Sequence, residues 1–146
     1  MARRPRLNFA GAIHHVTTRG IDHDPIYIGD DDRRAFLDML SDAAARHGWT
    51  VYAYCLMTNH YHLLIRTDRP TLSAGMRELN GRYAARFNRR QRRGGYVFQR
   101  RYASSLVESE LHLHAAGTYI EMNPVRAGMV KRPEDWPWSS RRFSAG

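Results

Sequence analysis

The stretch WTVYAYCLMTNHYHLLIR, residues 49–66, decides the fold of this chain. Its first eight residues, 49–56, are rich in aromatic and β-branched side chains, which is typical of a strand. Residues 57–59 form a short connection, and residues 60–66 have the composition of a second strand. We therefore predict a β-hairpin with a tight turn.

The elements on either side of this hairpin follow a regular order. Residues 13–19 predict a strand, and three acids at residues 30–32 open a helical apolar pattern that stops at Gly48. A second amphipathic helical pattern follows Pro70. Residues 96–107 then predict a strand and residues 108–123 a third helix, to which residues 124–127 add a turn.

Strand, helix, strand, strand, helix, strand is the order of the ferredoxin-like split βαβ fold. Right-handed crossovers would place the first and third strands in the centre, with both early helices on one face. We therefore predict an α+β fold, a ferredoxin-like antiparallel sheet with an added C-terminal helix. A single domain over residues 1–146 would include a basic N-terminal arm, 1–10, and a C-terminal segment, 129–146.

The charge of the chain favours nucleic acid as a partner. The 146 residues contain 23 Lys and Arg against 14 Asp and Glu, a net charge of +9, and Lys131 is the only lysine. Guanidinium groups bind phosphate with two parallel hydrogen bonds, which suits a nucleic-acid partner. A GC-rich genome would also explain the preference for arginine, but it does not explain the excess of positive charge.

Cysteine usage and hydropathy exclude several classes of protein. Cys55 is the only cysteine, so an intrachain disulfide and a cysteine-based zinc site are excluded. No apolar run has the length of a signal peptide core or of a membrane span. We therefore expect a cytoplasmic protein that is neither exported nor embedded in a membrane.

Two histidines in the hairpin are candidate metal ligands. His60 and His62 are two residues apart on a predicted strand, so both side chains point to the same side of the sheet and can converge on one ion. Imidazole is a good ligand for divalent metals, and two ligands leave positions open for substrate oxygens. The alternative is that both histidines are simply hydrogen-bonded or exposed.

Tyr119 and Asn123 share one face of the predicted third helix, one turn apart. The Asn123 oxygen could complete a metal shell, and the Tyr119 hydroxyl could attack phosphorus to form a phosphotyrosine. Structural alternatives stay open at this point. Tyr119 could be a core aromatic with an exposed hydroxyl, and Asn123 before Pro124 could be a helix N-cap.

Arginines cluster around the end of the second predicted helix. A run of this kind is usually a solvated face, but beside a site for phosphate chemistry it could follow a DNA backbone. The candidate DNA-binding residues are Arg82, Arg86, Arg89, Arg90, Arg92, Arg93, Arg100 and Arg101. Among the nearby aromatic residues we expect Tyr83 in the core, Tyr96 and Tyr102 either packed or stacked on bases, and Trp136 and Trp138 packed over the core.

Four motifs in this order resemble those of the REP-associated tyrosine transposases, which belong to the single-tyrosine HUH transposases of small bacterial insertion sequences. They are YCLMTNHYHLLI at residues 54–65, YVFQ at 96–99, YIEMNPVRAG at 119–128 and WPWSS at 136–140. Thr58 stands where many relatives have proline. The resemblance extends over residues 13–140, nearly the whole chain.

The resemblance implies a ferredoxin-like domain in which His60, His62 and Asn123 hold a divalent metal, Mg²⁺ or Mn²⁺. It also implies that Tyr119 attacks single-stranded or hairpin DNA of the REP type, leaving a 5′-phosphotyrosine and a free 3′-OH. The residues themselves leave two alternatives, a non-catalytic nucleic-acid-binding module and a metal-dependent nuclease that uses water. The sequence does not distinguish a monomer from a homodimer.

Overall fold

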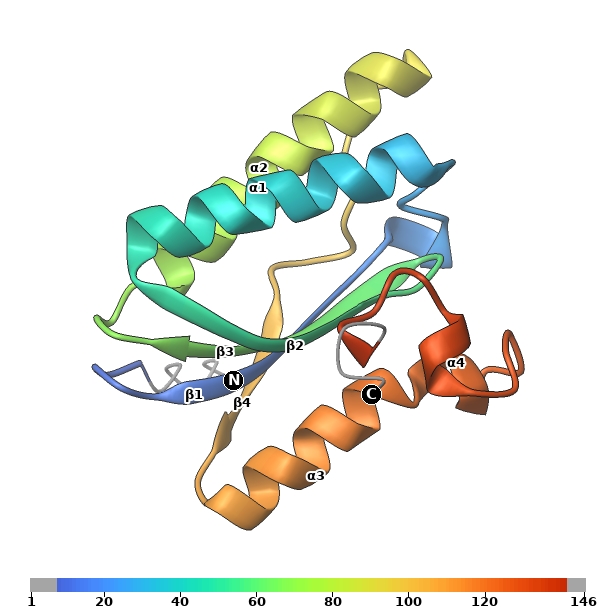
Figure 1. Ribbon diagram of the computed structural model, residues 1–146. Coiled ribbons are helices and arrows are strands. Elements are labelled where there is room, and N and C mark those ends of the chain that lie inside the picture. Colours follow the sequence, from blue (N-terminus) through green and yellow to red (C-terminus); the bar gives the residue numbers. More distant parts are fainter. Residues whose placement is uncertain (1–7, 142–146) are drawn as a thin grey trace, which may run out of the picture.

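The computed structural model describes residues 8–141, and its centre is a four-stranded antiparallel sheet (Figure 1). The strands are β1 (Ile13–Arg19), β2 (Trp49–Leu56), β3 (His60–Thr67) and β4 (Ala103–Val107), in the order β2-β3-β1-β4. The ferredoxin-like arrangement and the central position of the first and third strands are thereby confirmed. Most of the predicted N-terminal arm and the end of the C-terminal segment lie outside the described residues.

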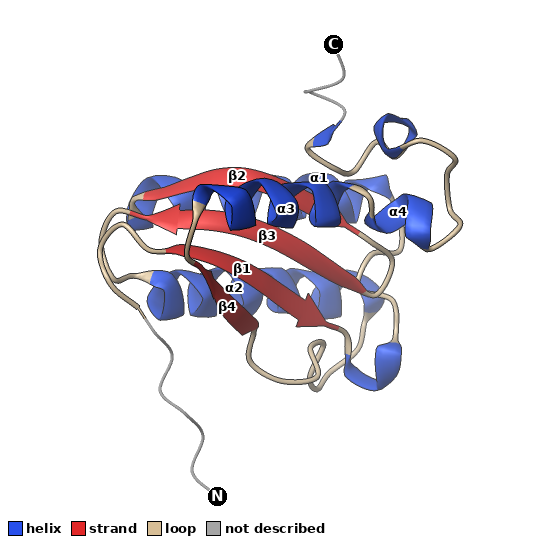
Figure 2. Ribbon diagram, turned by 90° about the horizontal axis from the view of Figure 1, so that it is seen from below, coloured by secondary structure: helices blue, strands red, loops and turns tan. Residues whose placement is uncertain are grey.

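The helices divide between the two faces of the sheet. Helices α1 (Asp30–His47) and α2 (Leu72–Gln91) lie together on one face, as predicted. Helix α3 (Glu110–Glu121) lies on the other face, where it packs against β2, β3 and β4 (Figure 2). None of the helices within residues 8–141 is both long and apolar enough to cross a membrane.

The boundaries of α1 follow the local signals in the sequence. Three aspartates occupy its first turn, where carboxylates interact favourably with the positive end of the helix dipole. The helix ends at Gly48, whose φ of 68° is a left-handed conformation that glycine adopts without steric cost. The predicted range of this helix is therefore confirmed.

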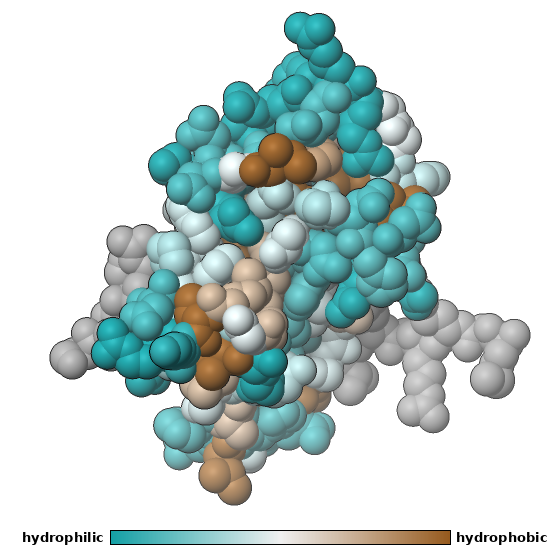
Figure 3. All heavy atoms as spheres, turned by 90° about the vertical axis from the view of Figure 1, so that its right-hand side faces the viewer, coloured by the Kyte–Doolittle hydropathy of each residue, from teal (hydrophilic) through white to brown (hydrophobic). Residues whose placement is uncertain are grey.

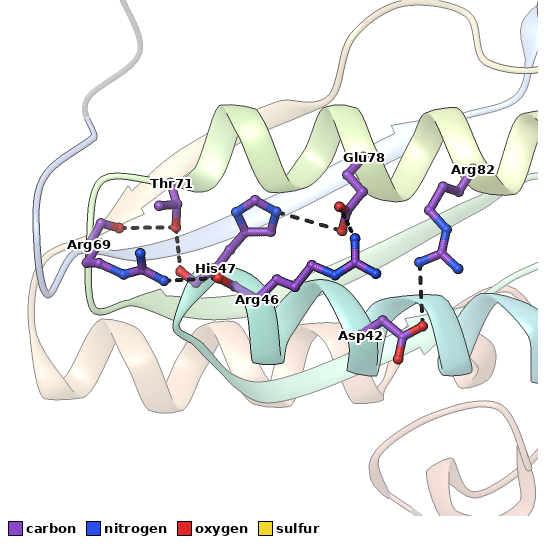
Figure 4. A network of polar contacts seen from close by, with 7 residues as sticks. All are labelled: Asp42, Arg46, His47, Arg69, Thr71, Glu78 and Arg82. Atoms are coloured by element: carbon purple, nitrogen blue, oxygen red, sulfur yellow. Dashed lines mark hydrogen bonds and ion pairs between the residues drawn. The ribbon is translucent and has the colours of Figure 1, made fainter.

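Polar contacts fix α1 and α2 to each other along their length (Figure 4). Arg46 on α1 contacts Glu78 on α2 at 2.7 Å, and Asp42 pairs with Arg82 at 3.5 Å. At the sheet end of this layer, Gly75 on α2 lies so close to the Trp49 ring that a Cβ there would be 2.1 Å from it. The tryptophan ring can therefore pack directly against α2 because residue 75 has no side chain.

The layer between these helices and the sheet is an aromatic and aliphatic core. Phe36, Tyr61 and Tyr83 pack with their rings 4.6–5.4 Å apart and are fully buried. The Tyr83 hydroxyl donates to the Ile26 carbonyl. The prediction that Tyr83 belongs to the core is confirmed.

The predicted strand over residues 96–107 is wrong in its first seven residues, because β4 begins at Ala103. β4 pairs with β1 only as far as Thr17. Beyond it, the chain is attached to the end of β1 by single hydrogen bonds, from the Gln99 amide to the Arg19 carbonyl (2.9 Å) and from the Ile21 amide to the Val97 carbonyl (2.9 Å). Residues 96–102 therefore run as a tethered loop.

The third predicted helix, residues 108–123, is also divided differently. Ser109 caps α3, since its Oγ accepts a hydrogen bond from the His112 amide at 3.0 Å. The helix ends at Glu121, and a separate turn, α4 (Asn123–Arg126), follows with Pro124 near its start. Two short 3₁₀ turns complete the elements, η1 (Ile21–His23) and η2 (Pro133–Asp135).

The C-terminal segment returns to the edge strand β2. The Leu56 amide donates to the Trp138 carbonyl at 2.8 Å, and the Trp136 indole donates to the Leu56 carbonyl at 3.0 Å. Both tryptophans are half-buried and pack against core residues. Their predicted packing role is confirmed.

Candidate active site

The two candidate metal ligands lie side by side on the α3 face of the sheet. The His60 and His62 rings are 5.1 Å apart between centroids. Tyr61, between them, points to the opposite face, where it is fully buried and its hydroxyl donates to Asn80 Oδ1 at 2.5 Å. The alternation of the strand thus separates the site from the core.

Burial keeps both rings neutral. Desolvation, with a smaller contribution from the cationic Arg19, lowers the pKa of His60 to about 4. Desolvation, with smaller contributions from the neighbouring His60 and His15, lowers the pKa of His62 to about 3. At neutral pH each ring therefore has an unprotonated nitrogen that can bind a metal.

A third histidine that sequence reasoning missed joins this pair. His15 on β1 lies with Nε2 3.0 Å from His62 Nδ1, within hydrogen-bond distance. Thr17 Oγ1 lies 3.4 Å from the same nitrogen. The spacing of His15 and Thr17 could have indicated this contact, because they are two residues apart on a strand next to β3 and therefore share one face. The adjacent His14 left open which face of that strand points to the site.

Tyr119 lies over the histidines. Its ring contacts His62 edge-on at 6.0 Å and His15 at 5.9 Å between centroids. The residue is 49% exposed, so it is not a core aromatic. The fold therefore brings the tyrosine of α3 and the histidines of β3 into one site. These residues are far apart in the sequence.

Arg126 is a second residue that sequence reasoning did not assign to the site. Its guanidinium lies 4.1 Å from the centroid of the Tyr119 ring, and its Nη2 donates to the Tyr119 carbonyl at 2.6 Å. The two contacts join α4 to the last turn of α3. One side chain thus holds both the ring and the backbone of Tyr119.

Asn123 is the first residue of α4 and lies between Tyr119 and Arg126 in the sequence. Its Nδ2 donates to the carbonyls of Tyr119 (3.2 Å) and Ile120 (3.3 Å), so the side chain folds back on α3 instead of capping the turn that follows. The amide oxygen is the atom that could bind a metal. Its role as a third ligand stays a prediction.

The donor set fits a divalent metal that shares its ligands with a substrate. Two neutral imidazoles and an amide oxygen are suitable ligands for Mn²⁺ and acceptable ones for Mg²⁺. Within residues 8–141, no three His, Cys, Asp or Glu side chains form a group that could hold a metal. Water or oxygens of a substrate would complete the coordination of an ion bound there.

The candidate DNA-binding arginines fall into two groups. Arg82, Arg86 and Arg90 pair with acids of α1 at 3.5, 2.9 and 3.7 Å. The shared partner of Arg86 and Arg90 is Asp32, whose side chain is only 4% exposed. The ion pair with Asp32 gives Arg86 a structural role in joining α1 and α2.

The other candidate arginines are more available for contacts with DNA phosphates. Among the described residues, no ion pair involves Arg89, Arg92, Arg93, Arg100 or Arg101. The first three lie at the end of α2, at the same end of the sheet as α4 (Figure 1). Viewed from that end, the upper part of the surface is mainly hydrophilic (Figure 3).

Solved structures share this fold. A REP-associated tyrosine transposase bound to a REP hairpin matches with a TM-score of 0.81 and 18% identity, over 100% of this chain and 87% of that one. A Deinococcus radiodurans R1 protein described as a transposase matches with a TM-score of 0.55 and 20% identity, over 82% of this chain and 96% of its own. At these identities the matches establish the fold.

Sequence comparison gives the family. A Haemophilus influenzae protein named "Putative REP-associated tyrosine transposase" is 28% identical in an alignment of length 99 that covers 60% of this chain and 56% of that protein, so the chain covers little more than half of that relative. The resemblance seen in the four motifs is thereby confirmed. The model of the family "Transposase IS200 like" matches residues 10–123, a range that includes the histidines, Tyr119 and Asn123. The chain therefore belongs to the IS200-like transposase family.

Proposed function

We propose that this protein is a metal-dependent transposase that cuts and rejoins single-stranded DNA through a 5′-phosphotyrosine at Tyr119. The observation that carries the proposal is the contact of a half-exposed tyrosine ring with His62, beside a second neutral histidine on the same strand. A tyrosine beside a pair of metal-binding nitrogens is suited to attack a phosphate. The net charge of +9 suits a DNA substrate.

In this proposal His60, His62 and Asn123 hold Mg²⁺ or Mn²⁺, which when bound polarises the phosphate and offsets its charge. The Tyr119 oxygen forms a bond to phosphorus while the bond from phosphorus to the 3′-oxygen breaks. The tyrosine proton leaves to solvent, and the 3′-oxygen takes up a proton. Attack by an incoming 3′-OH reverses the step, rejoins the strand and restores the tyrosine.

His15 and Arg126 orient the reacting groups. When His62 Nδ1 donates its proton to His15 Nε2, the other nitrogen of His62 keeps its lone pair for the metal. Arg126 holds the Tyr119 ring from the side of α4. Both residues would act through their neighbours, by fixing a tautomer and a ring position.

We further propose that the substrate is hairpin DNA of the REP type with an unpaired flank. The solved relative of the same fold is bound to a REP hairpin. The four motifs shared with REP-associated transposases include the histidine hairpin and the tyrosine helix of this site.

Incubation of end-labelled hairpin DNA with the protein and Mn²⁺ or Mg²⁺ tests the proposal. We expect a covalent protein–DNA adduct on a denaturing gel, absent without metal and absent in Tyr119→Phe. Tyr52→Phe is the matched control, since Tyr52 is 45% exposed on the edge strand β2, outside the group formed by the histidines and Tyr119, and should leave the adduct unchanged. Cutting without an adduct would identify a nuclease that uses water, and binding without cutting a non-catalytic module.

A further inference from the structure

A groove separate from the tyrosine site lies between α2 and the tethered loop that precedes β4. It has a volume of about 620 Å³, within the range of small-molecule and cofactor sites. Figure 1 shows the chain leaving the end of α2 and running back toward β4. The groove lies on the α2 side of the sheet, whereas Tyr119 lies on the opposite side, with α3.

The groove has apolar walls and a cationic rim. Met76, Val97 and Tyr102 form its floor and are at most 5% exposed. Arg77, Arg100 and Arg101 line it as well, and none of its lining residues is acidic. Within residues 8–141 these three arginines take part in no ion pair. An apolar ring that carries negative charge at its edge complements such a surface.

Tyr96 supplies an aromatic platform at the edge of the groove. Its side chain is 82% exposed, the largest exposure of an aromatic residue in the described chain. The backbone around it is nevertheless held, because Arg93 Nη2 donates to the Tyr96 carbonyl (3.2 Å) and Asn88 Nδ2 donates to the Gly95 carbonyl (2.8 Å). An exposed ring on a fixed backbone loses little conformational entropy when a flat ligand stacks on it.

The groove is connected to the tyrosine site through the end of β1. The Gln99 amide in the groove loop donates to the Arg19 carbonyl at 2.9 Å. Arg19 in turn pairs in register with His60 on β3. A DNA strand bound at the histidines would therefore meet the cationic Arg19 between the tyrosine site and the arginines of the groove.

We infer that the groove binds an unpaired nucleotide of the DNA substrate, with the base stacked on Tyr96 and the flanking phosphates on the arginines of the rim. This inference rests on the proposed action on single-stranded DNA and adds a second binding site to it. Base–aromatic stacking tolerates any base, so the groove would select for unpaired nucleotides more than for sequence.

Binding of a fluorescein-labelled 12-nucleotide oligothymidylate, compared with a 12-base-pair duplex, tests the inference by anisotropy. Tyr96→Ala should weaken single-strand binding about tenfold and leave duplex binding within about twofold. Tyr52→Ala, which removes an exposed tyrosine outside the groove, should change neither. Equal single-strand affinities in Tyr96→Ala and wild type would overturn the inference.

Gly81→Trp provides an independent variant that fills the groove. Gly81 lines the groove on α2, and a Cβ there would meet nothing within 4 Å, so a large side chain can enter the space without disturbing the fold. Replacing a helical glycine should not destabilise α2. Single-strand binding should fall about tenfold, as in Tyr96→Ala, and an equal fall for the duplex would overturn the assignment to an unpaired base.

The two proposals fail separately. If wild type binds the single strand through the groove but forms no adduct with the hairpin, the phosphotyrosine mechanism is wrong and the groove assignment stands. If the adduct forms and both groove variants bind the single strand as wild type does, the groove assignment is wrong. A groove that held a protein segment would give that second result.

Discussion

The two faces of the sheet are built from the same strands but serve different ends. On β3, Leu63 and Ile65 are fully buried beneath α1 and α2, whereas His60 and His62 face α3 and contact polar groups. Two long helices cover the first face, and a single 12-residue helix crosses the second. The face covered by α1 and α2 therefore stabilises the fold, and the face covered by α3 leaves Tyr119 accessible to a substrate.

The largest contrast between the faces is in activity. His60→Ala and His62→Ala should each reduce adduct formation at least about 100-fold, because each removes a proposed ligand. His47→Ala, at the end of α1 on the other face, should keep it. Calorimetric titration with Mn²⁺, with and without DNA, checks the cause: wild-type metal affinity in both ligand variants would remove these histidines from the site.

In stability, the larger effect is expected on the other face of the sheet, which α1 and α2 cover. Leu63→Ala should lower the free energy of unfolding by about 2–5 kcal/mol, since it leaves a cavity in the core. Its adduct yield per folded molecule should match that of wild type. Urea unfolding measures the first effect, and a loss of adduct in fully folded Leu63→Ala would show that the faces are not independent.

The arginines of the helical face can be separated by the same reasoning. Arg86→Gln should cost about 1–3 kcal/mol of stability, because Asp32 is nearly buried. Arg89→Gln with Arg92→Gln should leave stability unchanged and flatten the log–log salt dependence of single-strand binding by about 1.4, at roughly 0.7 per phosphate contact.

Neutralising Arg90 and Arg93 as well should flatten the slope further, to a total of about 3. Cleavage of prebound DNA at low salt should survive in all these variants. An unchanged slope would identify the end of α2 as a solvated face and move the search for the DNA track to Arg100 and Arg101.

The α3 face should make stability depend on pH in the metal-free protein. The folded-state pKa values of about 4 for His60 and about 3 for His62 lie below the ordinary value of 6.5, so the unfolded chain binds more protons between these limits. Stability should therefore fall as pH drops below 6.5, by up to about 1.4 kcal/mol per pH unit for each histidine. Urea unfolding from pH 7 to 4.5 measures it, and the double variant His60→Gln/His62→Gln should show a shallower fall.

The smallest expected effect concerns Arg126. Arg126→Gln should slow adduct formation about threefold to tenfold at saturating DNA, because a cation–π contact contributes about 1 kcal/mol. Arg126→Lys should recover part of the rate, since it keeps the charge but loses the planar stacking. Single-turnover gels measure both, with Arg132→Gln in the C-terminal segment as the control. A wild-type rate in Arg126→Gln would leave Tyr119 positioned by α3 alone.

Sequence patterns predicted those parts of the site that a single element contains. The spacing of His60 and His62 fixes their common face because strand side chains alternate, and it also fixes the opposite direction of Tyr61. The orientation of Asn123 was open, since the sequence favours a cap of the turn that follows as much as a ligand. The observed bonds to the carbonyls of α3 depend on where that helix ends.

The sequence by itself determined the element order, the core stripes and the boundaries of α1, because hydrophobic period, capping residues and glycine act over a few residues. Only the tertiary structure decided that His15 and Arg126 join Tyr119, and that Arg86 pairs with Asp32 while Arg100 and Arg101 line a groove. It also ended the pairing of β4 at Ala103. These contacts join residues distant in sequence, and their partners depend on strand register and helix packing, which no local pattern encodes.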